Sequence, residues 1–173
     1  MTFLVFLPPK DFRDETLNMV KLFFDRWRVP YKITSYSKGT CIGRHGETVK
    51  PDINTGMVSA QDYDGIVLVD GAGIDSYKLY EFRPLLDLMM QFDAAKKYIA
   101  AIDNSVKIVA RANIIKGKGI STPSDEETKR LVVLFHGVPT ENEVEFASNI
   151  ITIRNGSGVE RGMDEMLSRI GVK

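Results

Sequence analysis

Acidic side chains recur where apolar segments of the chain end. Residues 2–7, 64–70 and 98–102 read as buried strands, and the acids that follow or end them are Asp11, Asp14, Glu15, Asp70 and Asp103. Because the carboxyl ends of parallel strands share one edge of a sheet, these carboxylates are expected to converge. Hard cations such as Mg²⁺ prefer oxygen ligands of this kind. One interpretation is therefore a cation site made by Asp14, Glu15, Asp70 and Asp103.

Asp103 has two other possible roles, because it lies between strand 98–102 and a helix expected from Val106 onward. Its carboxylate would cap that helix by accepting backbone hydrogen bonds, which typically adds about 1 kcal/mol of stability. Alternatively, the carboxylate would act as a nucleophile, which requires a base nearby to activate water. The sequence favours the cap and leaves the nucleophile and the cation ligand as alternatives.

Other reactive residue types give weaker signals. Gly71-Ala72-Gly73 follows strand 64–70, but no Walker or dinucleotide pattern surrounds it, so a tight turn is predicted and no cofactor is expected. Cys41 is the only cysteine, which excludes a disulfide framework and a cysteine-based zinc site within these residues. His45 and His136 lack metal-ligand spacing and are expected at the surface.

The elements that position these residues alternate between strand and helix. Besides the strands above, the pattern predicts strands at 31–37, 144–147 and 149–154, and helices at 11–28, 82–97, 106–115, after the acidic cap at 124–127, and at 159–170. Gly39, Gly43 and Gly46 predict a small β-hairpin with His45 near its tip. We therefore expect an α/β fold of flavodoxin-like, doubly wound type, with a mostly parallel sheet sandwiched between helices, as one domain over residues 1–173.

Composition narrows the class of protein. Lys plus Arg equals Asp plus Glu, 23 against 23, so no overall field attracts nucleic acid or an anionic membrane, and neither partner is expected. No segment approaches the roughly 20 apolar residues that span a bilayer. With one cysteine and no signal-like start, a cytoplasmic protein is expected.

Several segments together resemble a known family. They are 3–7 followed by 11–15, then 35–39, 62–73, 100–103, 114–118 and 149–154. In this order and spacing the chain resembles the ThiJ/PfpI superfamily, relatives of the class I glutamine amidotransferases that include proteins described as intracellular proteases, deglycases, glyoxalases and chaperones. The resemblance covers nearly the whole chain. It implies a homo-oligomer, a dimer or larger.

The resemblance also implies where reactive groups would lie. Reactive members use a cysteine on a tight strand-to-helix turn, a nucleophile elbow, and this position falls on Asp103. The family glutamate falls on Thr16, or on Glu15 after a shift of one residue. The histidine that some members carry falls on Thr122, and the residue after the nucleophile is Asn104.

An anion-binding scaffold is implied as well. Backbone N–H groups at Gly71, Ala72 and Asn104 resemble the family's oxyanion hole, with Gly73 completing the turn. A carboxylate cannot reproduce the nucleophilicity or redox response of a thiolate, so the usual activities should be absent.

The sequence therefore predicts a diverged, non-catalytic protein, a pseudoenzyme, with a binding or regulatory pocket for a small molecule at the elbow. Its boundary would be formed by Glu15, Thr16, Gly71, Ala72, Asp103, Asn104 and Thr122. The alternative is a hydrolase that uses Asp103, or a cation held by Asp14, Glu15, Asp70 and Asp103.

Overall fold

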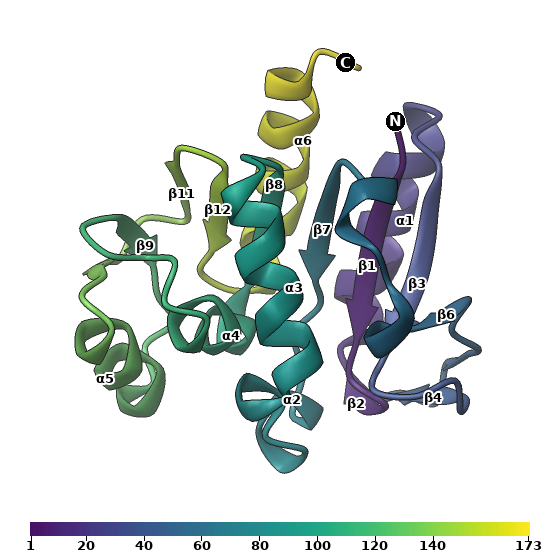
Figure 1. Ribbon diagram of the computed structural model, residues 1–173, viewed down its shortest axis with the longest axis horizontal. Coiled ribbons are helices and arrows are strands. Elements are labelled where there is room, and N and C mark those ends of the chain that lie inside the picture. The colour runs from purple at the N-terminus through teal and green to yellow at the C-terminus, as the bar shows by residue number, and fades with distance from the viewer.

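A seven-stranded sheet forms the centre of the molecule. A computed structural model describes residues 1–173, and Figure 1 shows the sheet with helices on both sides. The five central strands, all parallel, are β1 (Phe3–Leu7), β3 (Tyr31–Ser35), β7 (Gly65–Leu68), β8 (Tyr98–Ile102) and β12 (Ile150–Ile153). Across the sheet they lie in the order β3, β1, β7, β8, β12. Counted along the chain this order is 2-1-3-4-5, which confirms the predicted flavodoxin-like arrangement.

Two short strands complete the edges of this sheet. β6 (Ile53–Asn54) pairs in parallel with β3, and β11 (Val144–Ala147) pairs antiparallel with β12. Two smaller sheets stand apart from it. One holds β2 (Lys10–Phe12), β4 (Cys41–Gly43) and β5 (Thr48–Val49), and the other pairs β9 (Gly119–Ser121) with β10 (Val138–Thr140).

The helices cover both faces of the central sheet. Leu4 and Phe6 of β1 pack on the face that carries α3 (Arg83–Ala94) and α4 (Val106–Arg111). Phe3, Val5 and Leu7 pack on the other face, against α1 (Asp14–Arg26) and α6 (Val159–Ile170). Because side chains alternate along a strand, the fully apolar β1 fills both cores at once, as expected for a buried parallel strand.

Two further helices lie at the carboxyl end of the sheet or beside it. α2 (Gly73–Ser76) follows β7, and α5 (Glu126–Leu134) follows β9. The N-cap of α5 is Asp125, whose carboxylate accepts the backbone N–H of Thr128 at 2.9 Å. None of the helices combines the length and the apolar character that crossing a bilayer requires.

The predicted hairpin is confirmed. β4 and β5 are antiparallel, and His45 lies in the turn between them, where Gly46 has a φ of +92°. Helix 11–28 begins later than predicted, at Asp14, because residues 10–12 pair with β4 as strand β2. That pairing depends on a segment about 30 residues away, so no local pattern marks it.

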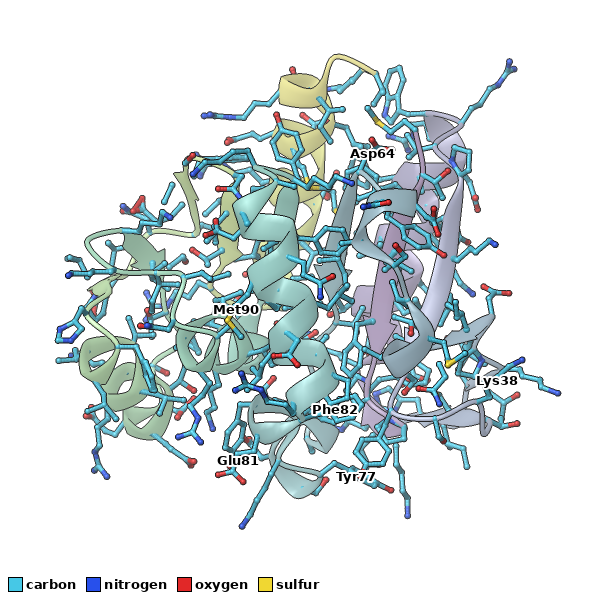
Figure 2. All side chains as sticks on the ribbon, in the orientation of Figure 1. Lys38, Asp64, Tyr77, Glu81, Phe82 and Met90 are labelled. Carbon is cyan, nitrogen blue, oxygen red and sulfur yellow. The ribbon has the colours of Figure 1, made fainter.

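The order of the strands along the chain reverses between β1 and β7, which makes this the topological switch point of the sheet. Ligands of such folds bind beyond the carboxyl ends of the strands at this point. The end of β2 crosses the end of β7: Phe12 forms an isolated bridge with Gly71, and the Arg13 N–H donates to the Asp70 carbonyl at 2.9 Å. Figure 2 shows Tyr77 and Phe82 near this end of the sheet and Asp64, just before β7, at the opposite end.

Candidate functional site

Asp103 occupies a strained turn at the end of β8. Its φ is +51°, in the left-handed region that residues with a Cβ seldom adopt, and a short 3-10 turn over Asp103–Ser105 leads directly into α4. The buried hydroxyl of Ser105 accepts the Ile102 N–H at 2.7 Å and lies 3.0 Å from the Leu68 carbonyl oxygen. Ser105 therefore ties the turn to β7, and the turn has the geometry of an elbow.

The predicted helix cap at Asp103 is wrong. Asp103 is not an N-cap residue, because the N-cap of the turn is Ile102 and that of α4 is Ser105, and the hydrogen bond to its carboxylate comes from the adjacent Asn104 N–H. Burial raises the pKa of Asp103; Arg13 and the Asn104 N–H lower it, whereas Asp125 and Asp75 raise it further, and the net pKa lies above the ordinary value. The carboxylate faces a cleft instead of capping α4.

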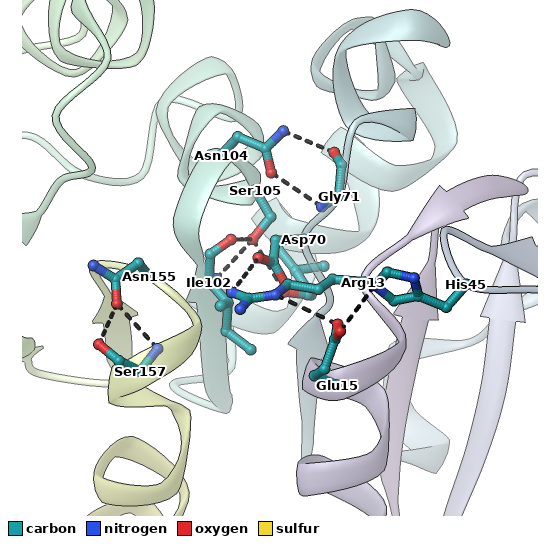
Figure 3. Close-up of polar contacts among 11 residues, drawn as sticks. Arg13, Glu15, His45, Asp70, Gly71, Ile102, Asn104, Ser105, Asn155 and Ser157 are labelled. Atoms are coloured by element: carbon teal, nitrogen blue, oxygen red, sulfur yellow. Dashed lines mark hydrogen bonds and ion pairs between the residues drawn. The ribbon is translucent and has the colours of Figure 1, made fainter. Parts of the chain in front are cut away.

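The side chain of Asn104 binds the Gly71 N–H, one of the backbone groups that were expected to bind an oxyanion. Its Oδ1 accepts the Gly71 N–H at 3.3 Å, and its Nδ2 donates to the Gly71 carbonyl at 2.8 Å (Figure 3). Nδ2 also lies 3.3 Å from Asp75 Oδ2. The Gly71 donor is therefore taken by the protein's own amide, and this part of the expected oxyanion hole is closed.

The Gly71-Ala72-Gly73 segment is a tight turn, as predicted. Gly71 has a φ of +144°, and a Cβ there would overlap the Asp11 carbonyl oxygen. A Cβ at Gly73 would likewise overlap the Lys10 carbonyl oxygen. Both glycines are required by the close approach of the β2 backbone.

Asp70 is a buried acid between β7 and this turn. It is 3% exposed, and Arg13 Nη1 lies 3.9 Å from its Oδ2 (Figure 3). The Thr16 hydroxyl faces the carboxylate without a hydrogen bond of normal geometry, so Asp70 Oδ1 and Thr16 Oγ1 are both buried without a partner. Burial raises the pKa of Asp70 to about 6; Asp103 raises it too, while Thr16 and Arg13 act in the opposite direction.

Glu15 faces the hairpin instead of the elbow. His45 Nε2 lies 3.1 Å from Glu15 Oε1, and Arg13 Nε lies 3.6 Å from Glu15 Oε2 (Figure 3). Glu15 thus does not take the place of the family glutamate opposite Asp103, and Thr16 contacts Asp70 instead. Neither Glu15 nor Thr16 lines the hollows that contain Asp103.

Asp14 also turns away from the cleft. Its carboxylate accepts the backbone N–H of His45 at 3.0 Å and of Glu47 at 3.2 Å. Burial opposes its ionised form, but these donors outweigh burial and hold the pKa of Asp14 below the ordinary value. The expected cation site of Asp14, Glu15, Asp70 and Asp103 therefore does not form, and no three acidic, histidine or cysteine side chains converge as metal ligands.

Thr122 follows β9 and does not line the hollows that contain Asp103. Its hydroxyl donates to the Ile120 carbonyl at 2.8 Å, and the residue lines an adjoining hollow with Lys129 and Arg154. Cys41 is buried in β4, and burial raises the pKa of its thiol above the ordinary value, with Ser35 opposing this shift. The elbow has no thiol, since Cys41 in β4 is the only cysteine.

The cleft around Asp103 consists of two hollows that share Asp103 and Asp125. The larger, about 780 Å³, is lined by Asp11 of β2, by Arg13 just before α1 and by the turn after β7. The smaller, about 460 Å³, is lined by the segments around Ser124, Glu141 and Asn155. Apart from Gly71 and Pro123, Ala72 is the only residue without a polar side chain that lines either hollow, so the cleft suits a polar ligand.

Comparison with known proteins identifies the relatives of this chain. A family model described as the DJ-1/PfpI family matches residues 1–158. The chain belongs to the DJ-1/PfpI family. Among curated relatives, an uncharacterized protein of Methanocaldococcus jannaschii is 33% identical over 129 residues, which cover 74% of this chain and 62% of that protein. A deglycase of Pyrococcus horikoshii is 29% identical over 92 residues, 53% of this chain and 54% of that protein.

Solved structures support the same DJ-1/PfpI fold. A ThiJ/PfpI domain protein of Brachyspira murdochii superposes with a TM-score of 0.91 at 22% identity, covering 99% of this chain and 97% of that one. DJ-1beta of Drosophila melanogaster gives 0.83 at 19% identity, covering 99% and 91%. The matched segments span less than two thirds of the two curated relatives named above, so those relatives do not fix the activity of this DJ-1/PfpI chain.

Sequence reasoning interpreted Asp70 only as a cation ligand, although its position at the carboxyl end of a strand placed it at the ligand-binding edge, and it missed two other contributors to this DJ-1/PfpI site. Arg13 and Ser105 were not considered, and only the folded chain brings Arg13 beside Asp70 and Ser105 beside Leu68.

The Asp14 carboxylate holds the β4–β5 hairpin of this DJ-1/PfpI protein by accepting two backbone N–H groups of its turn. Asp14→Ala should leave the two N–H groups of the turn without acceptors and lower the free energy of unfolding by about 1 kcal/mol. Trypsin should then cleave several-fold faster after Arg44, which is exposed in the turn. Asp25→Ala, an exposed acid on the same helix, serves as the control. Equal cleavage of both variants would show that Asp14 does not hold the hairpin.

Proposed function

We propose that this protein is a diverged, non-catalytic member of the DJ-1/PfpI family whose cleft at the elbow serves binding or regulation. One observation carries the proposal: the left-handed elbow at the end of β8 presents the carboxylate of Asp103. A carboxylate does not form the reversible sulfur adducts on which thiol-dependent members rely. Several curated relatives are named deglycases. With an aspartate at position 103 in place of the family's cysteine, this chain has no sulfur nucleophile at the elbow.

The surroundings of Asp103 support the proposal. The Gly71 N–H is occupied by Asn104, so a developing oxyanion would have to displace that amide. Glu15 is paired with His45, and the Thr122 hydroxyl is engaged at β9. No histidine lies in the cleft to relay a proton.

The test is turnover by the purified protein. Wild type should give no measurable consumption of methylglyoxal and no release from methylglyoxal-treated peptides, and Asp103→Asn should give the same result. Turnover by wild type that disappears in Asp103→Asn would refute the proposal. A thiol-containing relative such as the Pyrococcus furiosus deglycase, assayed in parallel, checks that the substrates are competent.

A second candidate function is a hydrolase that uses Asp103 as the nucleophile. The observation that favours it is the uncapped carboxylate in a strained turn with Asp70 nearby, because an acid with a pKa of about 6 is suited to act as a base near neutral pH. Hydrolysis of a panel of esters and amides that is lost in both Asp103→Asn and Asp70→Asn would establish it.

A further inference from the structure

The segments around helix α5 carry positive charge and no negative charge. Residues 104–124, which run from the elbow through α4 and β9, contain no Asp or Glu, and neither do residues 128–140, which form most of α5 and β10. The cations of these two segments are Lys107, Arg111, Lys116, Lys118, Lys129 and Arg130. Because charges over the whole chain balance at 23 against 23, this excess of cations is local to one part of the fold.

Only two of these cations have an acidic partner within the protein. Lys107 pairs with Asp75 and Glu127, and Arg111 lies 3.5 Å from Glu81. The other four form no ion pair, and three of them are exposed at the surface: Lys116, Lys129 and Arg130. These side chains are therefore available to the carboxylates of another molecule.

An exposed apolar patch lies beside the unpaired cations, at the last turn of α5 and the start of β10. Its members are Val133, Leu134 and Val138, which are 55%, 62% and 54% exposed. The Gly117 N–H donates to the His136 carbonyl at 2.8 Å, and the Val138 N–H donates to the Lys118 carbonyl at 2.8 Å. These bonds hold the segment that contains Lys116 and Lys118 next to the patch.

The cations and the apolar patch together form one surface. Arg130 lies one helical turn before Leu134, on the same outward side of α5, whereas Val132 points into the core. Figure 1 shows α5 at the outer edge of the molecule, beyond α4. We call the following set the basic-apolar surface: Lys116, Lys118, Arg130, Val133, Leu134 and Val138.

The composition of the basic-apolar surface favours a peptide over a membrane or a nucleic acid. A helix that lies in a membrane buries a whole apolar face in the lipid, but α5 packs its main apolar side on the protein and exposes only its last turn. A nucleic acid would use phosphate contacts and base stacking, and this surface has aliphatic side chains in place of aromatic ones. Carboxylates arranged around apolar side chains match it best.

We propose that the basic-apolar surface docks an acidic peptide segment of a partner protein. Apolar side chains of the peptide lie on Val133, Leu134 and Val138, and its carboxylates pair with Lys116 and Arg130. None of these residues lines the two hollows at Asp103, so the inference goes beyond the function proposed for the cleft and does not depend on it.

Fluorescence anisotropy with a labelled model peptide tests the inference. The probe has about 15 residues, four helical turns, with Leu at every third or fourth position and Glu elsewhere. Wild type should bind it saturably and more weakly as salt is added, because salt screens exposed charges. The same peptide with Lys in place of Glu should not bind, and neither should one with Ser in place of Leu.

Substitutions within the surface should weaken binding of this probe. Leu134→Gln and Arg130→Gln should each do so by about fivefold, because one removes an apolar contact and the other an ionic one. Leu22→Gln is the matched apolar control, since Leu22 is 48% exposed on α1, which covers the opposite face of the sheet. Lys50→Gln removes the same charge as Arg130→Gln from an exposed position before β6. Both controls should bind like wild type, and circular dichroism checks that each variant is folded.

Absence of saturable binding to the Glu/Leu peptide would overturn the inference, and so would binding that neither Leu134→Gln nor Arg130→Gln weakens. Tighter binding to vesicles that contain phosphatidylserine, or to single-stranded DNA, would assign the surface to a different class of partner. A dimer in light scattering that dissociates in Leu134→Gln would assign it to a second copy of this chain. Either of these results would also overturn the inference.

Discussion

Asp70→Asn is expected to raise the free energy of unfolding by about 3 kcal/mol at neutral pH. The buried carboxyl has a pKa of about 6 in the folded protein, against 3.8 for an ordinary aspartate. Ionisation of this group at neutral pH therefore destabilises the folded state, at about 1.4 kcal/mol for each tenfold difference in proton affinity. Asparagine keeps the shape of the protonated acid and removes that penalty.

The pH dependence gives the sign of the effect. Because the folded-state pKa lies above the unfolded value, Asp70 favours the folded state while it is protonated, and this contribution is lost as the pH rises from about 4 to about 6. Wild type and Asp70→Asn should thus be similarly stable near pH 4 and diverge above it. Urea unfolding of both proteins across this range measures the difference.

Asp62→Asn provides the comparison, because replacing an exposed aspartate at the other end of the sheet should change the free energy of unfolding only slightly at every pH. A constant difference between wild type and Asp70→Asn at every pH would contradict the assignment. A variant less stable than wild type at neutral pH would do the same. A buried acid that destabilises the fold is the kind of feature that proteins keep at functional sites, which supports our proposal that the cleft lined by Asp70 serves binding or regulation.

The arrangement of strands and helices was largely predictable from the sequence. Strand β1 and helix α6 lie where their patterns place them, because β1 is uniformly apolar and α6 has one apolar face. Elements held by distant partners were missed: β2 has the sequence Lys-Asp-Phe and exists only because it pairs with β4. The same holds for β9 and β10, which pair across an intervening helix.

The sequence predicted where the site residues lie relative to the strands, but not which groups their side chains contact. The order of the segments placed Asp103 at the end of β8, and its φ of +51° fits the elbow that the resemblance implied. Whether its carboxylate caps the helix depends on distances of a fraction of an ångström, which no sequence pattern encodes. Likewise, the partner of Asn104 is Gly71, 33 residues away, and the partners of Asp14 lie in the hairpin. The homo-oligomer expected from the resemblance stays a prediction.

A second large effect is expected at the ion pair behind the cleft. Lys107 on α4 has a side chain that is only 2% exposed, and its Nζ lies 2.6 Å from Asp75, 3.4 Å from Glu127 and 5.3 Å from the centre of the Tyr80 ring. Burial opposes the charged form, but Asp75 and then Glu127 outweigh it, so the pKa of Lys107 lies above the ordinary value. The ammonium is therefore a buried charge that depends on Asp75.

Asp75→Ala should lower the free energy of unfolding by about 3 kcal/mol, because it leaves a buried ammonium with only the longer contact to Glu127. Lys107→Met should lower it by only about 1 kcal/mol, since methionine fills a similar volume and the acids it releases are about half exposed or more. The double variant should be close to Lys107→Met alone, because the charge that Asp75 neutralises is then gone.

Urea unfolding of the two single variants and the double variant at one pH measures this cycle, with Asp87→Ala as the control. Asp87 forms an exposed pair with Arg83 at 3.0 Å, and its loss should change stability by no more than about 0.5 kcal/mol. If Lys107→Met were as destabilising as Asp75→Ala, packing rather than buried charge would explain the effect. Because Asp75 also contacts Asn104, Asp75→Ala should in addition loosen the amide that occupies the Gly71 N–H. Faster hydrogen exchange at Gly71 in Asp75→Ala than in Lys107→Met would show that Asp75 helps to hold the Asn104 amide on the Gly71 N–H.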